Sequence, residues 1–199
     1  QCVQEYTQIA LQMTVTMQDC GTVTVVHRLV NKGAWPVELA PWALSVMAQG
    51  GVEVVPQPNR ETGLLGNRGL ALWPYTDMSD PRVTWGEKYI LLRQDKTMER
   101  AFKFGLNNEK GFAAYFLKGC MFLNSYEAVL DGNYPDFGVS FETYTSNHIL
   151  EMETLGELTV IKPEQSVVHT ETWKLIDGVE MGGFSEKELD AVFQGENLD

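Results

Sequence analysis

Apolar and polar side chains alternate one by one near the start of the sequence. In the segment 9–18 every second residue is apolar, from Ile9 to Met17. This period of two predicts a strand with one buried face. A second alternating stretch covers 22–31, and the intervening Asp19-Cys20-Gly21 is typical of a tight turn. The sequence therefore predicts a β-hairpin at this end of the chain.

Short strand patterns continue along the rest of the chain, separated by turns that contain glycine or charged residues. The predicted strands span 36–49, 52–55, 88–93, 101–105, 111–117, 121–128, 138–145, 149–155, 158–161 and 166–176. Many short strands with regular turn signals are typical of a sandwich or a barrel. We therefore expect a mainly β fold, an antiparallel β-sandwich that forms a single domain over residues 1–199.

Two segments depart from the strand pattern. The stretch 56–82 is rich in proline and glycine, and irregular stretches of this length are usually functional or mobile. Near the C-terminus, Ser185 and Glu188 have the spacing of a capping box, and Leu189 and Phe193 belong to an apolar stripe. The sequence predicts a short C-terminal helix there.

The balance of charge narrows the class of partner. The chain has 27 acidic and 15 basic residues, a net charge of −12 and a pI near 4.7. Nucleic acids and anionic membrane surfaces are bound by basic patches, so we expect neither as a partner. No apolar run reaches the ~20 residues of a membrane-spanning helix. The sequence indicates neither a compartment nor an oligomeric state.

The cysteines and the common catalytic motifs suggest no cofactor. Cys2, Cys20 and Cys120 are an odd number and lack the spacing of metal ligands. Buried or incidental thiols are the favoured interpretation, and a single disulfide with one thiol left over is the alternative. The sequence has no nucleophile elbow, phosphate-binding loop, dinucleotide fingerprint or zinc motif. We expect neither a metal nor a cofactor.

A pair of glutamates marks the first candidate site. Glu151 and Glu153 lie two positions apart on a predicted strand, so they point to the same face and lie ~7 Å apart. Two carboxylates without partners cannot be buried in an apolar core at an acceptable cost. Their face is therefore either open to solvent or part of a polar cleft, and the spacing leaves both open.

The last predicted strand carries a second mixed face. His169, Glu171 and Trp173 point to the same side of it. A histidine with a carboxylate can act as a general acid or base, and tryptophan offers a platform for a sugar ring. A pairing of His169 with Glu171 at the rim of a sheet is the alternative. The isolated His27 is interpreted as a half-buried side chain.

Further candidate binding residues come from turns and from the irregular stretch. Asp136 lies in a proline-aspartate turn at the start of a strand, where it can accept hydrogen bonds from sugar hydroxyls or serve the turn alone. Trp73, Tyr75 and Arg82 belong to the irregular stretch, and Trp42 lies in an earlier strand region. Aromatic rings beside carboxylates are typical of carbohydrate sites.

Three motifs carry a resemblance to a known family. They are LWPYTDMSDPR at 72–82, YPDFG at 134–138 and the run NHILEMETLG that opens the segment 147–176. Together they resemble an uncharacterised bacterial branch of the galactose-mutarotase-like (aldose 1-epimerase-like) superfamily. The resemblance implies a supersandwich that binds carbohydrate on a concave face, here without most of the superfamily's N-terminal strands. It places the superfamily's catalytic glutamate at Glu153, whereas no histidine stands at 39–43, where the family's proton donor usually lies.

Three functional hypotheses follow. The first is a carbohydrate-binding protein, with Trp42, Trp73, Tyr75, Arg82, Asp136, Glu151 and Glu171 as candidate binding residues. The second is a sugar epimerase or mutarotase-like enzyme with Glu153 as general base and His169 or Arg82 as the second group. The third is a structural or interaction module. The sequence leaves open whether the protein is an enzyme.

Overall fold

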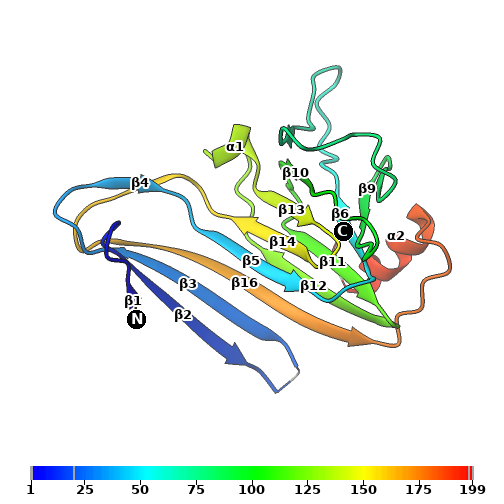
Figure 1. The fold of residues 1–199 in the computed structure, drawn as a ribbon, viewed down its shortest axis with the longest axis horizontal. Helices are drawn as coiled ribbons and strands as arrows, with labels where there is room; N and C mark the ends of the chain where they lie inside the picture. The colour runs from blue at the N-terminus through cyan, green and yellow to red at the C-terminus, as the bar shows by residue number, and fades with distance from the viewer. Residues whose placement is uncertain (1, 20, 197, 199) are drawn as a thin grey trace.

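The computed structural model describes residues 2–19, 21–196 and 198. It contains short strands and two helical segments (Figure 1). The strands are β1 (Cys2–Val3), β2 (Ile9–Met17), β3 (Val23–Asn31), β4 (Val37–Leu39), β5 (Trp42–Met47), β6 (Val52–Pro56), β7 (Leu70–Leu72), β8 (Val83–Trp85), β9 (Tyr89–Arg93), β10 (Phe102–Leu106), β11 (Phe112–Leu117), β12 (Cys120–Tyr126), β13 (Phe141–Thr145), β14 (Leu150–Leu155), β15 (Thr159–Ile161) and β16 (Ser166–Asp177). The helical segments are α1 (Pro135–Gly138) and α2 (Glu186–Gly195).

The strands form one large and one smaller antiparallel sheet. The nine-stranded sheet has the order β1-β2-β3-β16-β12-β11-β6-β9-β8, and the five-stranded sheet has the order β5-β14-β13-β10-β7. β15 and β4 form a separate pair. The mainly β, antiparallel sandwich that the sequence predicts is confirmed.

The main core lies between the two sheets. Phe104, Phe141 and Met152 point inward from the five-stranded sheet and pack with Tyr115 and Val55 of the nine-stranded sheet. In the nine-stranded sheet, β6 and β11 are nearly continuous apolar runs because both of their faces are covered. In the five-stranded sheet, β10, β13 and β14 alternate, with their apolar residues toward this core. We call the face of the five-stranded sheet that is turned away from this core its outer face. The packed core fixes the strands that position the side chains on this face.

A second core covers the opposite side of the nine-stranded sheet. Leu189 and Phe193 of α2 are buried there against apolar residues of β6, β11 and β12. The predicted capping box begins this helix: the Ser185 hydroxyl accepts from the Glu188 amide, and the Glu188 carboxylate accepts from the Ser185 amide. The C-terminal helix is thus confirmed.

The nine-stranded sheet extends beyond the smaller sheet at its β1 end (Figure 1). Met13, Val15 and Met17 of β2 are exposed there. Leu44 and Val46 of β5, the edge strand of the five-stranded sheet, are exposed as well. The predicted hairpin is confirmed, with β2 and β3 paired from Ile9↔Asn31 to Met17↔Val23.

The structure divides one predicted strand into two strands. The segment 36–49 divides at residues 40–41, because β4 pairs with β15 while β5 joins β14 in the five-stranded sheet. Pro41 has no amide hydrogen for a ladder, which fits this break. Most other predicted strands are present with ends that shift by a few residues.

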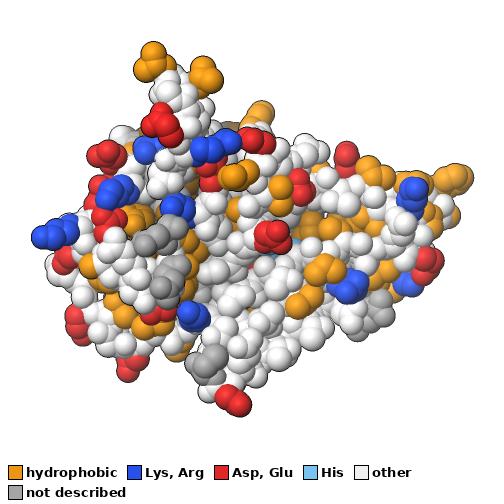
Figure 2. All heavy atoms as spheres, turned by 180° about the vertical axis from the view of Figure 1, so that it is seen from behind, with side chains coloured by type: hydrophobic (Ala, Val, Ile, Leu, Met, Phe, Trp, Pro, Cys, Tyr) orange, Lys and Arg blue, Asp and Glu red, His pale blue; other side chains and the backbone are white. Residues whose placement is uncertain are grey.

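The remaining structural findings concern the cysteines, the surface charge, and the search for membrane-spanning helices and metal-ligating clusters. Cys120 is a free thiol whose Sγ lies 3.2 Å from an Asp177 carboxylate oxygen. Cys20 and the side chain of Cys2 lie outside the described part, so for these two cysteines incidental thiols, with a single disulfide as the alternative, stay a prediction. On the face in Figure 2, basic side chains are interspersed with acidic ones. Within residues 2–19, 21–196 and 198, no helix is long and apolar enough to cross a bilayer, and no three metal-ligating side chains cluster.

Candidate functional site

A buried lysine lies at the centre of the outer face of the five-stranded sheet. The pairing of β10 with β13 places Lys103 opposite Tyr144, and the pairing of β13 with β14 places Glu142 opposite Glu153. Residues directly opposite each other in a ladder point to the same face. The distant strand β10 and the consecutive strands β13 and β14 thus bring one cation and two carboxylates together.

Short contacts hold this group. The Lys103 Nζ lies 2.7 Å from Glu142 Oε2 and 2.9 Å from Glu153 Oε2. The Trp42 Nε1–H donates to the same Glu153 oxygen at 2.7 Å. Glu142 and Glu153 are almost completely buried, and Lys103 is only 7% exposed. Burial of Glu153 is therefore tolerated because its charge is paired and hydrogen-bonded.

Two indole rings flank the ammonium group. The Lys103 Nζ lies 4.6 Å from the ring centroid of Trp73 and 5.1 Å from that of Trp42, within the range of cation–π attraction. Trp73 directly follows β7, whose Leu72 pairs with Phe104, so the ladder carries the indole to its place beside Lys103. We call Lys103, Glu142, Glu153, Trp42 and Trp73 the Lys103 cluster.

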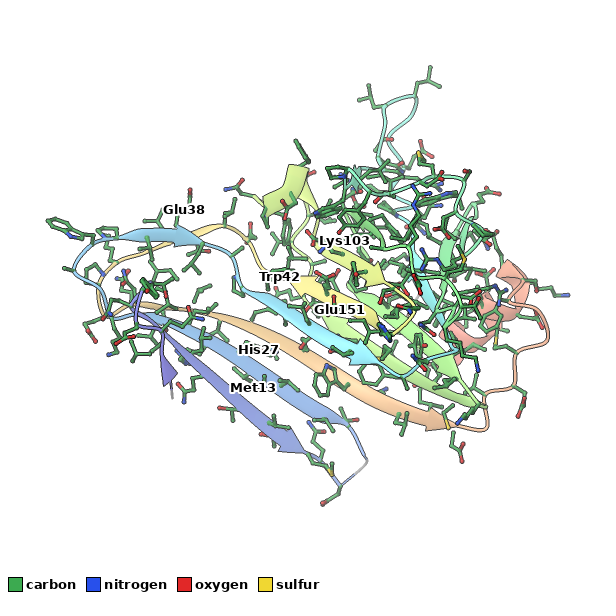
Figure 3. All side chains as sticks on the ribbon, viewed as in Figure 1. Met13, His27, Glu38, Trp42, Lys103 and Glu151 are labelled. Atoms are coloured by element: carbon green, nitrogen blue, oxygen red, sulfur yellow. The ribbon has the colours of Figure 1, made fainter. Side chains whose placement is uncertain are left out.

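The rim of the Lys103 cluster is open to solvent. Trp42 is 55% exposed and Tyr75 is 38% exposed. Glu151 is half-buried, on the same face as Glu153. In Figure 3, Trp42, Lys103 and Glu151 lie together on the five-stranded sheet, whereas His27 and Met13 lie on β3 and β2. The exposed indole and phenol and the half-buried carboxylate of Glu151 offer a mixed apolar and polar surface.

Burial and neighbouring charges shift the protonation of these groups. Burial raises the pKa of Glu142 to about 7, although hydrogen bonding to Lys103 opposes this rise. Burial by itself would lower the pKa of Lys103, but its bonds to Glu142 and Glu153 outweigh that effect and raise it. Burial also raises the pKa of Glu151, and the Glu153 charge adds to the rise. Near neutral pH, Glu142 is thus the group in this cluster that exchanges a proton most readily.

The turn with Asp136 approaches the same cluster. In α1, Asp136 and Phe137 have φ values of 49° and 69°, so this segment is a strained turn rather than a regular helix. Asp136 lies close enough to Glu142 to add to the rise in the pKa of Glu142, of which burial is the main cause. The structure therefore brings Asp136 together with Glu151, Glu153, Trp42, Trp73 and Tyr75, as one candidate site.

His169 and Glu171 lie elsewhere, between the two sheets. The Thr154 hydroxyl donates to Glu171 at 2.9 Å and lies 2.8 Å from His169 Nε2. Glu171 also accepts from Asn124 and lies 2.9 Å from His27 Nε2. Burial tends to raise the pKa of Glu171, but these bonds outweigh it and lower the pKa.

This position separates His169 from Glu153. Thr154 and Glu153 are neighbours in β14, so their side chains point to opposite faces of the five-stranded sheet. His169 reaches the inner face and Glu153 lies on the outer face, so the pairing of Glu153 with His169 that the sequence suggested does not form. Glu171 likewise lies outside the Lys103 cluster, in a network that links the two sheets.

Arg82 is also separate from the Lys103 cluster. Its guanidinium bonds Asp80 at 2.8 and 3.0 Å and the Arg100 carbonyl at 2.8 Å, and both Arg82 and Asp80 are almost completely buried. Burial tends to raise the pKa of Asp80, but the bonds from Arg82 lower it overall. This buried ion pair fixes the irregular stretch against the sheet, and it leaves Arg82 no direct contact with Glu153.

Sequence reasoning did not select Lys103 or Glu142. A signal was present in Phe102-Lys103-Phe104-Gly105-Leu106, where alternation places the lysine and the glycine on one face and the apolar residues on the other. Gly105 leaves room there, because a Cβ at this position would lie 3.1 Å from Glu142 Cγ. A charge on the covered face of a strand indicates that oppositely charged partners lie nearby.

Comparisons with known proteins add information at the level of the fold. No protein-family model matches the chain, and no curated protein sequence matches it. Solved structures do match. One is a galactose mutarotase-like protein from Lactobacillus casei, with 11% identity and a TM-score of 0.53, covering 85% of this chain and 64% of that one.

Two further structures agree with it. The Slr1438 protein from Synechocystis has 10% identity and a TM-score of 0.54, with 86% of this chain and 56% of that one covered. A candidate aldose 1-epimerase from Klebsiella pneumoniae has 9% identity and a TM-score of 0.57, with 98% and 52% covered. This chain therefore has the galactose-mutarotase-like fold, and it spans between 52% and 64% of the length of these three structures.

Proposed function

We propose that this protein binds a carbohydrate on the outer face of its five-stranded sheet, over Trp42, Tyr75 and Glu151. The observation that carries the proposal is the exposed indole of Trp42, which the Nε1–H bond to Glu153 holds in one orientation beside carboxylates. The likeness of the fold to mutarotase-like structures supports it as an analogy.

The chemistry of this surface suits a neutral or basic sugar better than an acidic one. Trp42 offers a flat apolar face on which the C–H side of a pyranose ring can lie. Glu151 and Asp136 offer carboxylate oxygens that accept hydrogen bonds from hydroxyl groups. Lys103 is already neutralised by Glu142 and Glu153, so no free cation remains in the Lys103 cluster to attract a carboxylate or phosphate on the ligand.

Isothermal titration calorimetry with matched tryptophan variants tests the proposal. Neutral hexoses, amino sugars and uronic acids are titrated into the protein, into Trp42→Ala and into Trp35→Ala. Trp35 is an exposed tryptophan outside the Lys103 cluster, so it controls for the loss of any exposed indole. We expect saturable binding of a neutral or amino sugar that Trp42→Ala abolishes and Trp35→Ala retains. Absence of binding across the panel, or equal loss in both variants, contradicts the proposal.

A second candidate function is proton transfer on the bound sugar, with Glu142 as the acid or base. Its pKa of about 7 suits this role near neutral pH. Both oxygens of Glu153 already accept from Lys103, and one also accepts from Trp42. Glu142 Oε1, by contrast, accepts no hydrogen bond from the described residues. This occupancy favours Glu142 over Glu153, the residue that the sequence suggested.

Magnetisation exchange between sugar anomers in NMR separates the two glutamates. If Glu142 transfers the proton, Glu142→Gln abolishes enzyme-dependent exchange, while Glu153→Gln affects it chiefly through folding and binding. Calorimetry on the same variants distinguishes loss of binding from loss of chemistry. Exchange that is absent in the unaltered protein, while the sugar binds, leaves carbohydrate binding as the function.

A further inference from the structure

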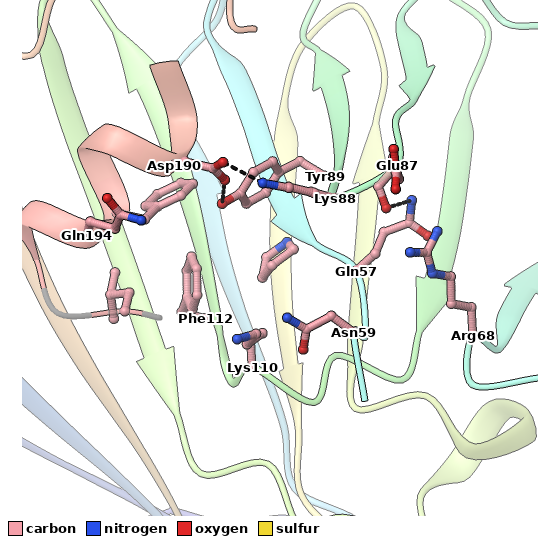
Figure 4. Close-up of a pocket in the computed structure, with 13 residues that line it drawn as sticks. Gln57, Asn59, Arg68, Glu87, Lys88, Tyr89, Lys110, Phe112, Asp190 and Gln194 are labelled. Atoms are coloured by element: carbon pink, nitrogen blue, oxygen red, sulfur yellow. Dashed lines mark hydrogen bonds and ion pairs between the residues drawn. The ribbon is translucent and has the colours of Figure 1, made fainter. Parts of the chain in front are cut away.

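A separate hollow lies on the far side of the molecule from the Lys103 cluster. It has a volume of about 390 Å³ and opens between α2 and the strands β6, β9 and β11 (Figure 4). Because α2 covers the side of the nine-stranded sheet that faces away from the five-stranded sheet, the full thickness of the sandwich separates this hollow from Trp42. Any ligand there is independent of the proposed carbohydrate site.

The hollow has an excess of positive charge in an acidic protein. Three cations line it, Arg68, Lys88 and Lys110, against two carboxylates, Glu87 and Asp190. The chain as a whole has a net charge of −12. Because opposite charges attract small ions into concave sites, this local reversal of sign favours an anion.

Two of the cations remain available for a ligand. Asp190 is occupied by the ion pair with Lys88 and by a hydrogen bond from the Tyr89 hydroxyl at 3.0 Å. Within the described part of the chain, Lys110 has no ion pair, and Arg68 uses only its Nε, which donates to the Pro58 carbonyl at 3.3 Å. The outer nitrogens of Arg68 are thus free to form a bidentate contact with a carboxylate or phosphate.

The remaining lining combines side-chain amides with aromatic and apolar residues. Figure 4 shows Asn59 between Lys110 and Arg68, with Gln194 across the hollow on α2. The rings of Phe112 and Phe193 also line the hollow and pack at 5.0 Å between their centroids. Side-chain amides can donate to and accept from hydroxyl groups, so the lining suits a hydroxylated ligand more than a purely apolar one.

We propose that this hollow binds a small hydroxylated organic anion, a phosphate ester or a carboxylate, between Arg68 and Lys110. The anionic group is held by the guanidinium and the ammonium group, and hydroxyl groups of the ligand contact Asn59 and Gln194.

Titrations followed by NMR test this inference on the full chain. Citrate and glycerol 3-phosphate are the anionic probes, which distinguish a carboxylate from a phosphate ligand, and glycerol is the uncharged comparison. We expect saturable shifts of the side-chain amide signals of Asn59 and Gln194 with at least one anion and none with glycerol. Added salt weakens the binding, since the two cations are partly exposed.

Charge-removing variants complete the test. The double variant Arg68→Gln/Lys110→Gln is expected to weaken binding at least tenfold. Lys187→Gln, which removes an exposed charge of α2 outside the hollow, should retain binding. Thermal unfolding confirms that the variants fold. The inference is overturned if neither anion gives saturable shifts at millimolar concentration, or if the double variant binds as tightly as the unaltered protein.

Discussion

Replacement of Lys103 by methionine should be the most damaging single change on the outer face of the five-stranded sheet. Methionine keeps a similar length but removes the charge, so the carboxylates of Glu142 and Glu153 stay buried without their shared cation. Loss of one partner from a buried ion pair typically costs about 3–5 kcal/mol. For a chain of this size the expected fall in melting temperature is about 6–20 °C.

The pH dependence of the stability of Lys103→Met gives a sharper test than its lower melting temperature alone. A carboxyl group whose pKa is raised in the folded state contributes stability that is present at low pH and is lost as the pH rises through the folded pKa. Removal of Lys103 removes an interaction that lowers the pKa of Glu142, so this pKa should rise further above its present value of about 7. The deficit of Lys103→Met should therefore be larger at about pH 8 than at about pH 5.

Two controls make this prediction specific. Lys162→Met removes an exposed lysine and should leave the melting temperature nearly unchanged. The double variant Lys103→Met/Glu142→Gln removes one of the unpaired carboxylates and should recover part of the lost stability. Thermal unfolding followed by circular dichroism measures all three. If Lys103→Met is no less stable than Lys162→Met, or if its deficit does not change with pH, the buried charge network is not as described.

Three further predictions concern the rest of the fold. Burial raises the pKa of Glu53 well above its usual value, so the stability linked to this group falls as the pH rises. Glu53→Gln should gain melting temperature over the unaltered protein as the pH is raised, and a constant difference would contradict this. Thr154→Val leaves His169 and Glu171 without their common partner and should cost about 1–3 kcal/mol in urea unfolding. Ser185→Ala removes the cap of α2 and should cost about 1 kcal/mol, whereas Ser185→Asp should retain most of the stability.

The sequence predicts many of the strands because one face of each strand is more buried than the other, and this difference produces an alternating pattern. In β16, alternation places His169, Glu171 and Trp173 on one face, and the structure agrees with this. In the same way Glu151 and Glu153 share a face of β14. The side-chain direction along one strand is a local property with a period of two, so one sequence suffices to predict it.

The assembly of the candidate site depends on information that is not local. β14 belongs to the five-stranded sheet and β16 to the nine-stranded sheet, so two faces that look equivalent in the sequence lie on different sides of a layer. Lys103 reaches Glu153 only because β13 lies between β10 and β14 in a particular register. Strand order and register follow from the packing of the whole domain, and no spacing within a single strand encodes them.

The short motifs that resemble a known family indicate candidate site residues that the alternating strand pattern does not reveal. The segments 72–82 and 134–138 contribute Trp73 and Asp136 to the candidate site, while their Arg82 contributes to a buried ion pair. Motifs that carry a family resemblance thus mix residues of the candidate site with residues that hold loops in place, and only the contacts distinguish the two.

The indole N–H signals of the protein give the most direct test of carbohydrate binding. Its five tryptophans should give five such signals in a ¹H–¹⁵N spectrum, each assignable with a Trp→Phe variant. The Trp42 N–H donates to Glu153 beneath the exposed ring, so it reports on a sugar placed over that ring. We predict that a neutral or amino sugar shifts the Trp42 and Trp73 signals in a saturable way and leaves Trp35 unchanged. Shifts confined to Trp35, or no shifts with any sugar, would contradict a carbohydrate site on this face.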